Sequence, residues 1–174
     1  MSVFQLLESI RDALAPKLAQ MPMAVRSRKG LPPDADEPEP MRPCAILLGS
    51  MPPTSPEAQS KAPFLVIQPM DGEDTPDGLQ TVRVVLRLCI VGDDCEAAEN
   101  DLLNLLAITR LALLELPGGV IGRYRLLPDG ESGSKLPWER PDEQVPPFLQ
   151  AHIFSQWQTA GAAKKPNLKM VDYE

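Results

Sequence analysis

The stretch from position 79 to 94, LQTVRVVLRLCIVGDD, constrains the fold more than any other part of this chain. Every even-numbered position from 82 to 90 in it is apolar: Val82, Val84, Leu86, Leu88 and Ile90. The positions between them include Thr81, Arg83 and Arg87. An apolar residue at every second position predicts a β-strand with one core face. The other face carries two arginines, which need either solvent or a partner surface.

Length and charge exclude several classes of protein. With 174 residues, of which 43% are hydrophobic, the chain is long enough for one domain with a core and short for two. A formal net charge of -7 argues against a nucleic-acid binder, which neutralises phosphates with Lys and Arg. No apolar stretch approaches the roughly 18 residues that a membrane span needs, and the amino terminus lacks a signal-peptide pattern. We therefore expect a soluble protein that is made inside the cell.

Proline marks a second unusual region. Of the 20 prolines in the chain, ten lie between positions 21 and 63. Proline fixes φ and lacks a backbone donor, so this region cannot remain helix or central sheet for long. It is either a disordered linker, as its acidic DADEPEP run suggests, or an extended arm ordered against another chain. We favour the arm, because a long loop in a compact domain is usually functional.

The other segments divide into helices and strands. Residues 2–19 predict an amphipathic helix that Ser2 caps. Residues 93–116 predict a second helix, with Asp93 in an acidic variant of the capping box. It has a core stripe (Leu102, Leu105, Leu106, Thr109 and Leu113) and further apolar positions (Leu103, Ala107, Leu111 and Leu114). The expected strands are residues 44–50, 63–69, 79–91, 120–127 and 148–158, and a turn at 71–78 makes the third strand the return of a hairpin.

The order of these elements, α-β-β-β-α-β-β, predicts an α+β fold. Residues 1–158 would form a single domain, in which a mixed sheet of about five strands packs with the N-terminal helix and the long central helix. Within it, residues 21–63 are the proline-rich arm, which holds one short strand, and residues 159–174 form a C-terminal tail. The second helix is apolar over so much of its circumference that it should bury more than one face. The extra face would meet the rest of the sheet or a neighbouring subunit.

Catalytic and metal-binding patterns are missing from the sequence. The single histidine, His152, stands in an expected strand without a partner group, so a structural role is far commoner for it than catalysis. Cys44, Cys89 and Cys95 make an odd number without CxxC spacing, which suits a reducing compartment and predicts Cys89 as a small buried hydrophobe. No Cys, His or carboxylate group has the spacing of a metal site. We expect no enzymatic activity, no metal and no cofactor.

One loop, GESGSK at residues 130–135, superficially resembles a phosphate-binding loop. That motif needs four residues between its glycines and then Gly-Lys-Ser/Thr opening a helix. Here the second glycine comes early, Leu136 and Pro137 follow Lys135, and no helical sequence comes next. A flexible or interface loop is the better interpretation.

Several central segments form a pattern when they are taken together. They are AILLGSMPP, APFLVIQP, the strand VRVVLRLCIVGDD, the leucine-rich helix after it, and PFLQAHIFSQWQ near the end. In this pattern, from residue 44 to 158 and with a helix ahead of it, the chain resembles the tail-terminator (tail-completion) proteins of long-tailed bacteriophages. The proline-rich insertion and the C-terminal tail depart from that family.

The resemblance implies a ring, typically of six copies, that caps the tail tube and stops its polymerisation. Its partners would be further copies of itself, the major tail-tube protein and the head-tail connector. DNA would pass through the ring without specific binding, and no membrane is involved. The protein would be made in the host bacterial cytoplasm and would end in the tail or neck of the virion.

A ring also suggests a role for the two arginines. Head-to-tail contacts use two different surfaces of each subunit. Arg83 and Arg87 would then lie at a subunit boundary, with acidic partners in loops such as residues 73–74 or Asp93 and Asp94. The alternative is that both arginines are solvent-exposed on an antiparallel sheet, and periodicity does not distinguish the two. We take Arg83, Arg87, Asp93 and Asp94 as candidate subunit-interface residues.

Two other functions stay open at this point. One is a different adaptor at the neck of the virion, such as a connector or head-completion protein, because small α+β domains occur there too. The other, which we favour less, is a small-ligand-binding domain or an enzyme. Fold alone does not decide between such functions.

Overall fold

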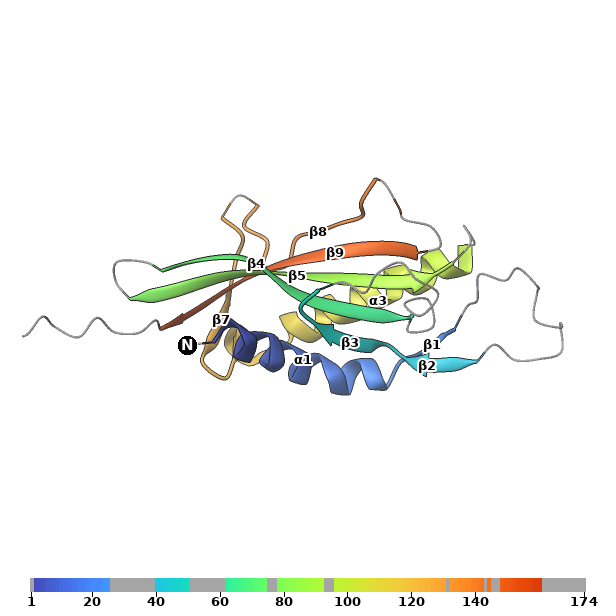
Figure 1. Ribbon diagram of the computed structural model, residues 1–174, viewed down its shortest axis with the longest axis horizontal. Coiled ribbons are helices and arrows are strands. Elements are labelled where there is room, and N and C mark those ends of the chain that lie inside the picture. The colour runs from blue at the N-terminus through green and yellow to red at the C-terminus, as the bar shows by residue number, and fades with distance from the viewer. Residues whose placement is uncertain are drawn as a thin grey trace, which may run out of the picture.

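The computed structural model describes residues 2–25, 40–50, 62–74, 78–92, 96–130, 132–142, 144 and 148–160. These residues form an α+β fold, as the sequence predicts, with α1 (Val3–Ala19) and α3 (Glu96–Leu114) on one side of a mixed sheet (Figure 1). The strands are β1 (Pro22–Ala24), β2 (Met41–Pro43), β3 (Ala45–Leu48), β4 (Phe64–Asp74), β5 (Leu79–Val91), β6 (Val120–Ile121), β7 (Tyr124–Leu127), β8 (Trp138–Glu139) and β9 (Phe148–Ala160).

The large sheet has the strand order β3-β4-β5-β9-β7-β6, and β8 pairs with β9 away from this path. β3 and β4 run parallel, whereas β5 is antiparallel to both of its neighbours, β4 and β9. The longest pairing joins β5 to β9, from Leu79 opposite Ala160 to Val91 opposite Phe148. β1 and β2 form a separate two-stranded sheet. The predicted mixed sheet is confirmed, and β3 forms one of its edges.

The core lies between the helices and one face of the sheet. The five even-numbered apolar positions of β5 belong to it, and none is more than 5% exposed: Val82, Val84, Leu86, Leu88 and Ile90. The predicted stripe of α3 is also buried: Leu102, Leu105, Leu106, Thr109 and Leu113. Trp157 of β9 fills the same layer, and its indole N–H donates to Ser155 Oγ at 3.0 Å. Ser155 Oγ in turn donates to the Val84 carbonyl at 3.1 Å, so this buried polar chain is satisfied.

Local sequence explains where the helices begin. Ser2 caps α1, because its Oγ accepts a hydrogen bond from the Phe4 amide at 3.2 Å. Gly92 lies between β5 and α3, where a Cβ atom would stand 2.4 Å from the Cβ of Ala98. Only glycine therefore fits this close approach. Residues 93–95, including the predicted cap Asp93, lie outside the described residues.

Four sequence-based expectations about the strands need correction. The expected turn at 71–78 starts too early, because β4 continues to Asp74 across a bulge that follows Pro69. Proline is tolerated there because the site is a bulge on a strand edge. The expected strand at 120–127 is a hairpin of β6 and β7, which Gly122 turns with a φ of 57°. The last strand runs two residues further than expected, to Ala160.

The fourth correction concerns loops that were expected to carry little structure. The proline-rich arm at 21–63 contributes β1 and β2 as well as β3, and the rest of it lies outside the described residues. The polar segment before β9 contains β8, because Trp138 and Glu139 pair with Ile153 and His152. Short strands of two or three residues have no periodicity to reveal them in a sequence.

Two neighbouring leucines of α3 test this division between core and surface. Leu102 is 1% exposed, whereas Leu103 is 47% exposed. Leu102→Ala should lower the free energy of unfolding by about 2–5 kcal/mol, because it leaves a cavity in the core. Leu103→Ala should change it by less than about 0.5 kcal/mol. Urea denaturation of both variants measures this, and equal losses would contradict the orientation of α3.

Candidate interaction surface

The side of the sheet that faces away from the helices carries the polar positions of β5. We call it the outer face, and its centre consists of Arg83, Val85 and Arg87 of β5 with Gln156, Phe154 and His152 opposite them on β9. One end of this face is closed by a second apolar cluster: Ala62, Phe64, Val66, Cys89, Val91 and Phe148. The outer face is therefore buried at the end that this cluster covers and exposed near Arg83.

Arg83 is exposed and has an acidic partner within its own chain. Its Nε donates to Asp71 Oδ1 at 2.7 Å, and its Nη2 donates to Asp71 Oδ2. The hydrogen bond from Arg83 lowers the pKa of the Asp71 carboxyl group. The sequence pointed to residues 73–74 as partners, but the bulge in β4 places Asp71 directly opposite Arg83. Because the side chains of Arg83 and Asp71 are 59% and 50% exposed, this pair contributes little to stability.

Arg87 has quite different surroundings. It lies opposite His152 in the sheet, and its Nε is buried without a hydrogen-bond partner in the described part of the chain. The Nδ1 of His152 is 3.4 Å from Glu139 Oε1, and its Nε2 is likewise buried without a partner there. A buried polar atom that makes no hydrogen bond lowers the stability of the fold. Arg87 Nε and His152 Nε2 are two such atoms, one on each of the paired strands β5 and β9.

The four candidate interface residues differ in what the structure shows of them. Arg83 and Arg87 project from the same face of β5, but among the described residues only Arg83 has a carboxylate partner. Asp93 and Asp94 lie outside the described residues, so the structure does not place them against either arginine.

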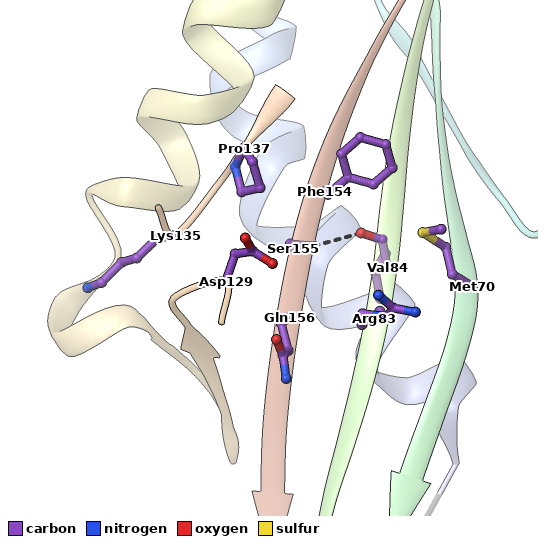
Figure 2. A pocket seen from close by; sticks show the side chains of 9 residues that line it. All are labelled: Met70, Arg83, Val84, Asp129, Lys135, Pro137, Phe154, Ser155 and Gln156. Atoms are coloured by element: carbon purple, nitrogen blue, oxygen red, sulfur yellow. Dashed lines mark hydrogen bonds between the residues drawn. The ribbon is translucent and has the colours of Figure 1, made fainter. Parts of the chain in front are cut away.

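A pocket of about 230 Å³ opens on the outer face beside Arg83. Figure 2 shows its lining, which includes Met70 of β4, Phe154 and Gln156 of β9, and the loop residues Asp129 and Pro137. A second hollow of about 550 Å³ shares Arg83, Asp129 and Gln156 with it. The outer-face pocket therefore combines apolar and polar walls from three separate parts of the chain.

The loop from β7 to β8 completes this pocket. The Asp129 carboxylate accepts hydrogen bonds from the Ser132 amide at 2.9 Å and the Ser132 hydroxyl at 2.8 Å, which folds the loop into a tight turn. Leu136 is buried in the main core and anchors the far end of the turn. Lys135 extends away from Asp129 (Figure 2). The described part of the GESGSK motif is thus a turn and not the entrance to a helix, in line with its sequence-based interpretation.

Sequence reasoning did not identify the pocket residues Met70, Asp129 and Phe154. One signal was available for Phe154, since His152, Phe154 and Gln156 alternate with the core positions of β9. No comparable signal marks Asp129, because its position depends on how the loop folds back onto the sheet.

A second surface lies on α3, on the side away from the sheet. We call it the helix ridge, and it consists of Leu103, Ala107, Leu111 and Leu114. Its three leucines are 47%, 54% and 47% exposed. The sequence predicted an apolar excess on this helix, and the described residues leave that excess uncovered. Contiguous apolar side chains at a surface are typical of interaction sites.

The thiols of the two described cysteines, Cys44 and Cys89, are poor nucleophiles. Burial raises the pKa of Cys44 and of Cys89 to about 12, so both stay protonated at neutral pH. Cys89 is fully buried, as predicted. Across the described ranges, no cluster of three or more His, Cys, Asp or Glu residues is arranged to hold a metal ion. No helix in those ranges is long and apolar enough to cross a membrane.

The surroundings of His152 predict how stability responds to pH. Burial lowers its pKa, Glu139 raises it, and the charge of Arg87 lowers it further, with a net decrease. The unfolded chain therefore takes up this proton more readily, so the folded state should lose stability as the pH falls below about 6.5. His152→Gln should reduce this loss, as measured by urea denaturation at a series of pH values. Glu139→Gln should enlarge it, and identical pH profiles for all three proteins would contradict the prediction.

Comparison with known proteins adds no family to this description. No protein-family model matches the chain, and no curated protein matches it significantly. Support for a function must therefore come from the sequence pattern of the chain and from its two surfaces, the outer face and the helix ridge.

Proposed function

We propose that this protein is a structural component of a phage virion. It forms a ring at the head-proximal end of the tail tube, ends polymerisation of the tube and offers a surface to the head connector. The observation that carries this proposal is where the resembling segments lie. AILLGSMPP, APFLVIQP, VRVVLRLCIVGDD and PFLQAHIFSQWQ contain β3, β4, β5 and β9, which are four consecutive strands of one sheet. A pattern scattered over the sequence thus belongs to one structural unit.

Two unlike surfaces support assembly into a ring. The helix ridge is apolar and about half exposed, and the outer-face pocket is a hollow with apolar and polar walls. Ring closure requires head-to-tail contacts between different patches on neighbouring subunits. A chain whose described residues leave two different patches exposed on opposite sides of one sheet meets this requirement.

The partners follow from that role. They are further copies of this chain, in a ring of six, together with the major tail-tube protein and the connector. DNA passes through the ring without sequence-specific contacts, in keeping with the net charge of -7. The protein performs no enzymatic step and resides in the tail or neck of the virion.

A small-ligand-binding function has less support. The outer-face pocket measures about 230 Å³, whereas sites for small molecules are commonly about 300–1,000 Å³. The adjoining hollow of about 550 Å³ falls within that range, but its walls are polar residues and glycines, whereas ligand sites are mostly apolar.

The test of the proposed function is a tube-capping assay. The chain is added to a polymerising major tail-tube protein from the same genome, and tube lengths are measured by negative-stain electron microscopy. We expect shorter tubes with a ring at one end, because a bound terminator blocks the addition of further tube subunits. Tube protein alone is the control. Unchanged lengths and tube ends without this chain would rule the proposal out.

A further inference from the structure

The first half of β9 has a sequence that favours pairing with copies of itself. Residues 148–154, FLQAHIF, contain no proline, glycine, lysine, arginine or carboxylate. Segments of six or seven residues with high β-propensity, low charge and no proline assemble into cross-β structure when their backbone is accessible. β5 pairs with one side of this segment throughout its length. The opposite edge of the segment therefore needs protection from other chains.

The protection found elsewhere in the sheet is missing from this edge. β7 covers β9 only further along, at residues 156–158. The free edge of β4 carries Pro69, a bulge and the acidic run 71–74, which discourage strand addition. Residues 148–154 contain neither proline nor charge of this kind, and their register with β5 is continuous. Another segment must therefore cover them.

That segment is residues 136–144, which we call the edge strap, and of which residues 136–142 and 144 are described. The Pro137 carbonyl accepts a hydrogen bond from the Phe154 amide at 2.9 Å. The next two residues form β8, which pairs with residues 152–153 of β9 (Figure 1). The backbone of the strap thus covers the edge only from residue 154 back to residue 152.

Gln144 continues the cover with its side chain. Its Oε1 accepts a hydrogen bond from the Gln150 amide at 2.6 Å, and its Nε2 donates to the Gln150 carbonyl at 3.5 Å. A carboxamide carries an acceptor and a donor side by side, so it can take the place of a peptide group from a neighbouring strand. The same Nε2 donates to the Pro141 carbonyl at 2.6 Å, which ties the amide to the strap itself. Gln144 therefore stands in for a missing strand opposite Gln150.

The two halves of the strap are held unequally. Leu136 is 1% exposed in the core, and its carbonyl accepts a hydrogen bond from Arg110 Nε at 3.2 Å. Arg140 forms an ion pair with Glu99 of α3, but the two side chains are 44% and 29% exposed, so the pair adds little stability. The first half of the strap is anchored in the core, whereas the second half depends mainly on the Gln144 amide.

We propose that the edge strap is an autoinhibitory cover of β9 and that Gln144 is the positioning residue that keeps it closed. When its amide releases Gln150, the edge of residues 148–154 becomes free to pair with the same segment of a second copy. Two identical edges that pair antiparallel are self-complementary, and this segment has no like charges to oppose the contact. The device does not depend on the proposed ring function, because it concerns an edge that the closed chain hides.

Hydrogen exchange at the Gln150 amide tests whether Gln144 closes the strap. In Gln144→Ala, exchange at this amide should become about five- to tenfold faster, because its hydrogen-bond acceptor is lost. Gln144→Glu keeps an acceptor and should exchange more slowly than the alanine variant. Gln20→Ala, at an exposed glutamine that ends α1, is the control and should match the unchanged protein. NMR of the amide measures all four, and equal rates in the unchanged and Gln144→Ala proteins would overturn the role of Gln144.

Self-association tests what the open edge does. The variant Arg140→Ala with Gln144→Ala should form assemblies that bind thioflavin T at concentrations where the unchanged protein forms none. Adding Gln150→Lys to this variant should abolish them, because it places a charge in the exposed segment. Circular dichroism checks that each variant remains folded. A folded open variant that forms no such assemblies, or assemblies that persist with Gln150→Lys, would overturn the proposal.

Discussion

The pairing of β5 with β9 is the constraint on which the rest of the structure depends. The two strands pair without interruption from Leu79 opposite Ala160 to Val91 opposite Phe148. Because side chains alternate between faces, a shift of one residue would turn every core residue of a strand outward. The buried hydrogen bond from Ser155 to the Val84 carbonyl spans this pair of strands. The helices, the pocket and the outer face all take their positions from this register.

The same register explains the unusual polar chemistry of the outer face. It sets Arg87 opposite His152, so a permanent cation lies beside a histidine whose pKa is lowered by burial. It sets Arg83 opposite Gln156 on one side, while the bulge in β4 brings Asp71 to the other. One arginine is therefore neutralised within the chain, and the other is partly covered with an unused donor. Two arginines on one strand thus have different surroundings, an exposed ion pair for Arg83 and partial burial for Arg87.

The end of β4 has features that oppose uncontrolled strand pairing. β3 pairs with β4 only as far as Leu48 opposite Ile67, so the later part of β4 is an edge in the described structure. That edge carries Pro69, a bulge and the acidic run 71–74, all of which discourage addition of another strand. In the proposed ring, contacts between copies would accordingly use side chains and not backbone pairing along this edge.

The sequence by itself determined the long strands and the helices, because their periodicity is a local property. The alternation along β5 and the stripe of α3 predicted which residues are buried, and Ser2 marked the start of α1. Only the tertiary structure decided which residues meet across strands, since that depends on register, bulges and loop folding. The partner of Arg83, the hairpin at 120–127 and the loop around Asp129 all arise in this way. The sequence left open whether the extra apolar positions of α3 meet the sheet or a neighbouring subunit, and only the structure shows that Leu103, Leu111 and Leu114 are about half exposed.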